Sequence, residues 1–148
     1  MSSYQGVHRT AAGTNLTILA LESGASVVGK IHQIVLGSAA TPADVATRFD
    51  ILRHTVAGAV GTAVVEKPTD PQAAAASCNL RGGTMTEPTY EADFLLEIPL
   101  NQRATFTWIA TNPGRELRST VGAANGIGVR SIASGGTPEI GCTIAWDE

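Results

Sequence analysis

The stretch 47–76, which reads TRFDILRHTVAGAVGTAVVEKPTDPQAAAA, decides how the rest of the chain is organised. It opens with a strand-like segment at 48–56 and continues into a glycine- and alanine-rich segment at 57–65. Pro68 and Pro71 bracket the next few residues, and proline excludes a central strand there because it cannot donate to the ladder. We therefore expect two strands to lead into this stretch and several to return after it.

The segment 48–56 is predicted to be a strand with contacts on both faces. Phe49 and Ile51 share one face with a basic residue, whereas Asp50 and His54 lie on the other face with apolar residues. A strand between a core and water is typically apolar on one face and polar on the other, but neither face of this segment is purely apolar or purely polar. The mixture indicates a core on one side and a loop or a partner on the other.

Strand-like runs recur on both sides of this stretch. The clearest is 91–98, in which Ala92, Phe94, Leu96 and Ile98 are predicted to face the core. The other predicted strands are 16–21, 27–36, 104–110, 127–133 and 139–146, with an edge strand at 62–65 and a loop or edge strand at 115–123. The spacing predicts an all-β fold, a single-domain antiparallel β-sandwich that is jelly-roll-like.

The chain has 148 residues, so a single domain is expected. Residues 1–15 are polar and lack periodicity, which predicts a flexible N-terminal arm or one that crosses to another subunit. Residues 16–148 are predicted to form the sandwich, with a long loop excursion at 58–89 interpreted as an inserted lobe that packs on other copies. Loops longer than about 12–15 residues are uncommon and usually functional. Short helices are expected at 42–45 and 71–77, each begun by a polar residue followed by proline.

Composition narrows the classes of partner. Charged residues make up 16% of the chain, against about 25% in ordinary domains, so part of the surface is expected to be covered by other subunits. The net charge is −3 and the basic residues are scattered, which argues against nucleic acid as a partner. No apolar run reaches the roughly 18 residues that span a bilayer, and the N-terminus does not resemble a secretory signal. We therefore expect no membrane partner and synthesis in a cytoplasm.

The three histidines are the first candidates for chemistry. His32 and His54 fall in successive predicted strands and could lie side by side, as a metal pair or an acid–base pair, or as two polar positions on a half-buried face. A metal site needs a third ligand, and no His or Cys, including His8, is placed to supply it. We assign no metal, no cofactor and no metal-binding residue.

Catalytic motifs are not apparent elsewhere. Asp50 and His54 with one of the many serines could form a triad, but no serine lies in a GxSxG turn. The carboxylates Glu91, Asp93 and Glu97 alternate along one strand. They could act as a glycosidase pair or as calcium ligands, but the simpler interpretation is a solvated strand face. The sequence NGIG at 125–128 lacks the remainder of a phosphate loop. We assign no catalytic residue and predict that the chain is not an enzyme.

Two cysteines and a few aromatic residues complete the set of candidates. Cys78 and Cys142 are interpreted as reduced, partly buried thiols, with a disulfide as the alternative. The aromatic residues are interpreted as core rather than as a sugar-stacking platform, because a small core needs most of them. These residues are Phe49, Phe94, Phe106, Trp108 and Trp146.

The order of these features resembles a family of small structural proteins of tailed bacteriophages, the minor capsid or head-decoration (cement) proteins. The residues that carry the resemblance are KIHQIVLG at 30–37, TPAD at 41–44, RFDI at 48–51, GAVGTAVVEKPTDP with the following alanines at 58–76, and CTIAWDE at 142–148. The resemblance spans roughly 16–148. It implies a non-enzymatic β-sandwich on the capsid surface of a virion, whose partners are other copies of itself and a major capsid protein.

Several functions remain open from sequence. The first is a capsid decoration or cement subunit, acting as a homo-oligomer such as a trimer or ring, with the excursion and the N-terminal arm making the contacts. The second is a jelly-roll binding module, a lectin or receptor-binding domain, for which Trp108 or Tyr90 could be recruited. The third is another phage part: a major coat, tail-tube or head-completion subunit.

Overall fold

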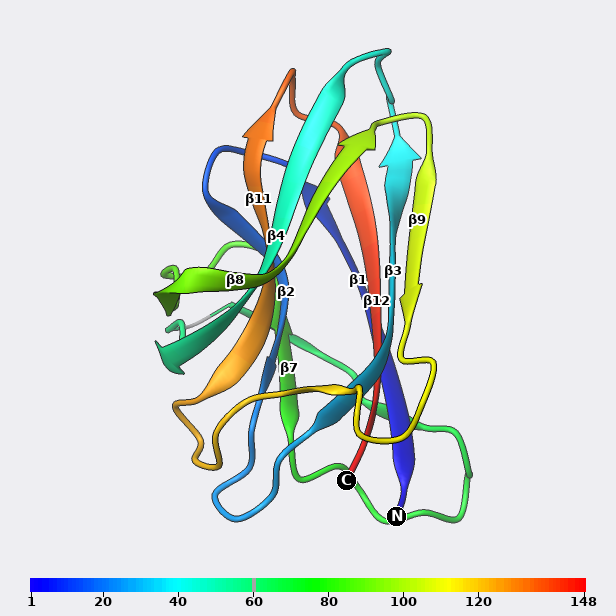
Figure 1. The fold of residues 1–148 in the computed structure, drawn as a ribbon, viewed down its shortest axis with the longest axis vertical. Helices are drawn as coiled ribbons and strands as arrows, with labels where there is room; N and C mark the ends of the chain where they lie inside the picture. Colours follow the sequence, from blue (N-terminus) through cyan, green and yellow to red (C-terminus); the bar gives the residue numbers. More distant parts are fainter. Residues whose placement is uncertain (60) are drawn as a thin grey trace.

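The computed structural model of the chain describes residues 1–59 and 61–148 and contains two antiparallel sheets that pack face to face (Figure 1). Sheet A is composed of β1 (Ser3–Ala11), β3 (Lys30–Ala40), β6 (Lys67–Pro68), β9 (Thr105–Ile109), β10 (Leu117–Arg118) and β12 (Glu139–Asp147). Sheet B is composed of β2 (Leu16–Glu22), β4 (Ala46–Val56), β5 (Thr62–Val64), β7 (Asn79–Gly82), β8 (Thr89–Asn101) and β11 (Gly126–Ser134). The predicted all-β sandwich is confirmed.

Along the chain the long strands alternate between the two sheets, except that β4 and β8 follow one another within sheet B. The order across sheet A is β9, β3, β12, β1, and the order across sheet B is β2, β11, β4, β8. The first and last long strands, β1 and β12, are therefore neighbours. The short strands extend the edges: β10 pairs with β3 beside β9, β6 lies beyond β1, and β7 and β5 lie beyond β2.

The interior between the sheets is filled by apolar side chains. In β12 the alternate residues Ile140, Cys142, Ile144 and Trp146 are all buried, as strand periodicity requires when one face meets the core. The ring of Trp146 stacks on that of Tyr4 with centroids 5.7 Å apart. Burying each large apolar side chain stabilises the fold by roughly 1.5–3 kcal/mol, so this layer supplies most of the driving force for folding.

The strand β4 has buried residues on both faces, which confirms the interpretation of its mixed alternation. Phe49 and Ile51 belong to the core cluster between the sheets. Asp50, Leu52 and His54 are also buried although they lie at the alternate positions, on the opposite face of sheet B.

The predicted N-terminal arm at 1–15 is wrong for most of its length. Ser3–Ala11 forms β1, which pairs with β12 over all nine of its residues. The termini are held together, since the N–H of Ser2 donates to the carbonyl of Glu148 and the N–H of Glu148 donates to that of Ser2. The segment looked unstructured because its polar residues alternate with small ones, and a glycine takes one inward position at Gly6.

The excursion at 58–89 is part of the sandwich rather than an inserted lobe. It contributes β5 and β7 to sheet B and β6 to sheet A, so it runs along the side of both sheets. The carboxylate of Glu148 accepts hydrogen bonds from the N–H groups of Ser77 and Cys78, each at 2.9 Å, and the Tyr4 hydroxyl donates to the carbonyl of Ala74. Val60 lies outside the described residues.

The two predicted helices are also wrong. Residues 71–77 contain a single turn, in which the Asp70 side chain accepts from the N–H of Gln72 and the Asp70 carbonyl accepts from that of Ala73. Near 42–45, Thr41 has a φ of 52°, in the left-handed region, which is incompatible with entering a right-handed helix. The capping residues are therefore present, but the turns do not propagate, because short helices need packing to be stable.

The predicted inward face of 91–98 is correct only in its second half. Ile98 is buried and Leu96 packs against the core, whereas Phe94 is 52% exposed. The register between β4 and β8 shifts beside Leu52, so that Leu95 has no partner of its own. An extra residue in a strand reverses the faces of the side chains before it relative to those after it, which places Phe94 on the outer surface although Leu96 and Ile98 face the core.

Candidate functional site

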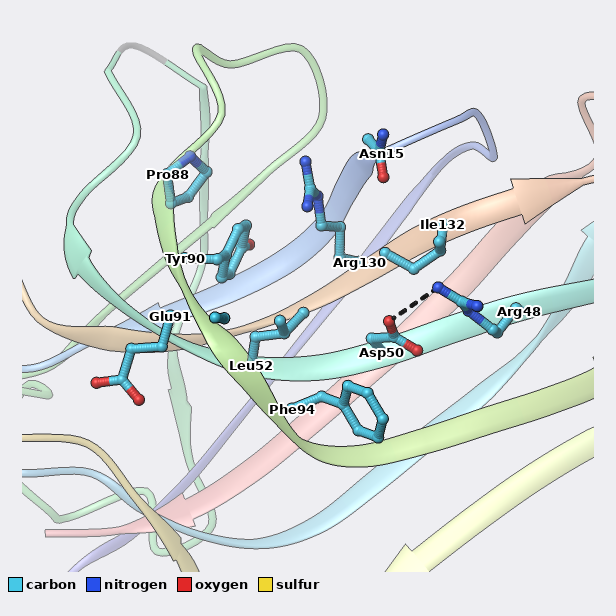
Figure 2. A pocket seen from close by; sticks show the side chains of 11 residues that line it. Asn15, Arg48, Asp50, Leu52, Pro88, Tyr90, Glu91, Phe94, Arg130 and Ile132 are labelled. Carbon is cyan, nitrogen blue, oxygen red and sulfur yellow. Dashed lines mark hydrogen bonds and ion pairs between the residues drawn. The ribbon is translucent and has the colours of Figure 1, made fainter.

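A polar hollow of about 450 Å³ lies on the outer face of sheet B, away from the core (Figure 2). Its lining comes from β4, β8 and β11, from Asn15, which precedes β2, and from Pro88, which precedes β8. We call it the sheet-B hollow; its lining includes Arg48, Asp50, Tyr90, Glu91, Phe94 and Arg130. Volumes of about 300–1,000 Å³ are typical of small-molecule sites, so the hollow could admit a ligand of modest size.

The hollow exists because β8 departs from regular pairing with β4. The register shifts three times between Ile51 and Val56, and β8 has more residues than β4 between the pairs Ile51–Leu96 and His54–Tyr90. Extra residues bend a strand and increase its twist. In Figure 1 the N-terminal half of β8 accordingly turns across the sheet.

Two glycines of β11 make room for aromatic rings on this face. A Cβ at Gly128 would overlap the hydroxyl of Tyr90, and a Cβ at Gly126 would overlap the ring of His54. The two rings meet edge to face, with centroids 5.9 Å apart. The NGIG sequence at 125–128 therefore has a packing role in which its glycines clear the surface of β11 for two neighbouring side chains.

A hydrogen-bond network fixes one wall of the hollow. The Thr17 hydroxyl lies 2.7 Å from that of Tyr90 and donates to Glu87 at 2.5 Å, while the Thr17 N–H also donates to Glu87, at 2.9 Å. The guanidinium of Arg130 lies 5.2 Å from the centre of the Tyr90 ring, and its Nε is 3.8 Å from Glu87. Burial raises the pKa of the Tyr90 hydroxyl, so this group stays neutral.

Asp50 is the most unusual group of the hollow. Its side chain is 6% exposed, yet its Oδ1 has no hydrogen-bond partner. Its Oδ2 makes one long contact, 3.4 Å, with the guanidinium of Arg48. Burial raises the pKa of the Asp50 carboxyl against the opposing effect of Arg48. An almost buried carboxylate with an unused acceptor oxygen costs free energy, which a ligand that donates a hydrogen bond could offset.

The two candidate histidines, His32 and His54, are not brought together. His32 lies in sheet A, 3.3 Å from the Ser3 hydroxyl and 3.7 Å from Asp147, whereas His54 lies in sheet B. The expectation that these histidines lie side by side is wrong, because β3 and β4 belong to opposite sheets. Nδ1 of His54 pairs with the carbonyl of Ala124 at 3.1 Å, and burial lowers the pKa of its imidazole. Among 1–59 and 61–148, no group of three or more His, Cys, Asp and Glu side chains could hold a metal ion.

The remaining candidates fall in structural positions. Cys78 and Cys142 are both free and buried, which confirms the interpretation of two thiols, and burial raises the pKa of Cys78 to about 11. Glu91, Asp93 and Glu97 are exposed, as expected of a solvated face. Of the aromatic residues, Phe49 and Trp146 are in the core and Phe106 and Trp108 pack against it, so only the prediction for Phe94 is wrong.

Two further hollows lie on the described surface. One, of about 400 Å³, runs between β1 and β5 and is lined by residues such as Val7, Val65 and Lys67. His8 lines it too, with its ring against Gly82 and a pKa lowered by burial. The other, of about 360 Å³, lies beside Trp108 at the end of β9.

No protein-family model, curated protein or solved structure matches the chain. Within the described part of the chain, no helix is long and apolar enough to cross a membrane.

Sequence reasoning missed the sheet-B hollow as a site. Its members are spread from Asn15 to Ile132, and no motif joins them. The available signal was the mixed alternation of 48–56, which predicted contacts on the second face of β4 without saying which groups make them. The position of Arg130 over Tyr90 depends on pairing between distant strands, which one sequence does not specify.

Proposed function

We propose that the chain is a structural subunit of a virion, a decoration or cement protein that stabilises a tailed-phage head through subunit contacts. The observation that carries the proposal is the order of the long strands. We infer a jelly roll from the orders β1-β12-β3-β9 and β2-β11-β4-β8, because two interleaved Greek keys produce this arrangement. Viral capsid domains are one of the main groups of proteins built on that plan.

The side of the sandwich formed by β1 and β5 supports a role in assembly. We call it the open side. β5 ends sheet B, and β6 covers β1 only at Tyr4 and Gln5, so the outer edge of β1 beyond Gln5 has no strand partner in the described part of the chain. Val7 and Val65 line the groove there and are 56% and 69% exposed. Unpaired edges with apolar side chains favour pairing with another chain.

The mechanism would be mechanical. A chain with few charged residues opposes association weakly. Copies that bind the assembled shell, as trimers or rings and against a major capsid protein, shift the equilibrium toward the shell by mass action. The open side would supply the contacts between subunits that the sequence predicted for an N-terminal arm.

The first experiment asks where the chain is found. Antibodies raised against the purified chain are used for immunogold electron microscopy of the particles made by the genome that encodes it. Labelling distributed over the heads of intact particles is the expected result. Labelling confined to tails, or found on no particle, would contradict the decoration role.

The second measurement asks whether the open side mediates assembly. The mass in solution is determined by size-exclusion chromatography with light scattering at micromolar concentration, and a multiple of 15.2 kDa is expected. Val7→Lys places a charge on the open edge and should shift the chain to a monomer. Val121→Lys is the matched control, because Val121 is 48% exposed but does not line the groove of the open side. A wild-type monomer, or equal behaviour of the two variants, would count against the proposed surface.

A further inference from the structure

The sheet-B hollow has features that contacts between subunits do not require. Asp50 is nearly buried at its base with an unpartnered Oδ1, and Phe94 is 52% exposed at its edge. A buried acceptor without a partner is unfavourable in a surface that contacts only water, and an exposed aromatic ring in the same hollow offers an apolar contact to a ligand. Their presence in one hollow therefore points to an occupant, whatever role the chain has in assembly.

The charges of the lining limit what the occupant can be. The ionised side chains that line the hollow are Arg48 and Arg130 with the carboxylates Asp50 and Glu91, so their formal charges balance. A strongly anionic or cationic ligand would leave one pair uncompensated. The ligand should be neutral overall and should donate and accept hydrogen bonds at closely spaced points.

Hydroxyl groups meet these requirements. Each hydroxyl is one donor and carries two acceptor lone pairs, so a pair of neighbouring hydroxyls can donate to Asp50 and accept from Arg130 or Asn15. Figure 2 shows Asp50, Arg130 and Asn15 around the same opening, with Phe94 on the opposite side of Asp50 from Arg130. The C–H face of a sugar ring could pack on the exposed Phe94 ring, as apolar groups pack on aromatic side chains.

We propose that the sheet-B hollow is a binding site for a neutral saccharide, in which Asp50 accepts from ring hydroxyls, Arg130 and Asn15 donate to them, and Phe94 packs against the ring. This site goes beyond the structural role and does not depend on it. The hollow would bind the sugar without breaking any of its bonds.

Arg48 supplies the means of access to Asp50. Its guanidinium lies 3.4 Å from Asp50 and 3.8 Å from Glu97, and its side chain is 46% exposed. It can therefore turn toward Glu97 and keep an ion pair while the carboxylate of Asp50 becomes available. Arg130 is different, because its packing on Tyr90 and its contact with Glu87 hold it in place as a preorganised donor.

The test is a titration of the isotopically labelled full chain, followed by NMR, with the methyl glycosides of glucose, galactose and mannose. Open sites that enclose one ring bind with dissociation constants on the order of millimolar, so each is added to roughly ten millimolar. At least one glycoside is expected to shift the amide signals of Leu52, Tyr90 and Arg130 in a saturable way. If none of the three shifts these signals, the proposal is overturned.

Variants identify the residues responsible. Asp50→Asn and Phe94→Ala should each weaken binding about tenfold, because each removes one principal contact. Asp93→Asn is the matched control, since Asp93 is an exposed carboxylate beside Phe94 on β8 that does not line the hollow. The affinity of this variant should equal that of the wild type. Affinity that survives both Asp50→Asn and Phe94→Ala would place the ligand elsewhere and reject the site.

Two further binding experiments identify the charge of the ligand and its source. Glucuronate in place of methyl glucoside tests the charge balance, and a preference for glucuronate would overturn the assignment of a neutral ligand. Immobilised neutral polysaccharide distinguishes a surface glycan from a free sugar. Retention of the wild type and loss of retention by Asp50→Asn would identify a glycan, whereas binding of the monosaccharides without retention would identify a free sugar; both results support the site.

Discussion

The interior of the sandwich and the sheet-B hollow lie on the two faces of sheet B, and they bury different kinds of side chain. On one face of β4, Phe49 and Ile51 enter a filled apolar core in which each is at most 1% exposed. On the other face of the same strand, Asp50 lies almost equally far from water with an oxygen that has no hydrogen-bond partner. The strand thus has one face that stabilises the fold and one face that costs stability.

In the proposed binding role, this difference separates the surface that stabilises the fold from the surface that recognises a ligand. A buried apolar layer supplies free energy without specifying a ligand, whereas a buried carboxylate, an exposed aromatic ring and a preorganised arginine supply recognition at a cost in stability. The open side of β1 and β5 is a third kind of surface, whose unpaired edges suit another copy of the chain. Substitutions on the two faces of sheet B should therefore have effects of different size and even of opposite sign.

The largest effect is expected in the interior. Trp146→Ala removes a fully buried side chain that stacks on Tyr4 and donates to Glu148 at 3.1 Å. Large aromatic to alanine changes in cores cost about 3–5 kcal/mol, which is a large part of the stability of a small domain. Chemical denaturation followed by fluorescence measures the change. Trp108→Ala, at a partly buried position, is the control and should cost less; equal losses would mean that the interior is not centred on Trp146.

The second effect tests the wall of the hollow. Gly128→Ala puts a Cβ where the Tyr90 hydroxyl lies, so the ring must move and its bond to Thr17 must break, at a cost of about 1–3 kcal/mol. Gly141→Ala is the matched control in β12, because its nearest neighbouring atom would be 3.8 Å away. Thermal melting of both variants checks the difference. A Gly128→Ala protein as stable as Gly141→Ala would show that Tyr90 is free to leave the wall.

The fold was largely predictable because its signals are local. Alternation in 139–146 follows the burial of β12 except at Ala145, which is buried as well, and the other predicted strands lie within a few residues of observed ones, whereas β1, β6 and β7 were not predicted. The hydrophobic period of two and the turn residues are properties of short segments, and they determine strands wherever one face is buried. A fold class inferred from such segments needs no knowledge of which strands pair.

The errors arose where long-range pairing decides the structure. The segment at 1–15 looked unstructured, but β12 supplies a partner for Ser3–Ala11. The excursion at 58–89 looked separate, but its strand β7 pairs with β2, and the carboxylate of Glu148 accepts a hydrogen bond from the backbone of the excursion. The sheet-B hollow depends on a register shift beside Leu52 that no composition or period indicates. One sequence carries no direct record of these distant contacts.

A smaller effect, of opposite sign, is expected for Asp50→Asn. The pKa of Asp50 is raised above its ordinary 3.8 by burial, with Glu97 adding to this and Arg48 and Arg130 opposing it. A carboxyl with a raised pKa in the folded state contributes its full stability below the unfolded pKa and loses it as pH rises through the folded pKa. The ionised form therefore destabilises the fold at neutral pH, and the neutral amide should make the variant equally stable or more stable by up to about 1 kcal/mol.

The measurement for Asp50→Asn is the difference in unfolding free energy between variant and wild type across pH 3 to 7. The difference should favour the variant near pH 7 and shrink toward pH 3, where the wild-type carboxyl is protonated. A variant that is clearly less stable at pH 7 would mean that the contact with Arg48 outweighs the burial of the charge.

The smallest effect is expected for Phe94→Asp, the substitution that best separates the sequence pattern from the structure. The alternation of 91–98 places Phe94 in the core, where an unpaired charge would unfold the domain. In the structure the side chain is 52% exposed beyond the register shift, and substitutions at such positions usually change stability by no more than about 0.5 kcal/mol. The melting temperature should therefore stay close to that of the wild type. Phe49→Asp, at the fully buried position on the inner face of β4, is the matched control and should abolish cooperative unfolding; a collapse of the Phe94→Asp protein as well would place Phe94 in the interior and remove the hollow.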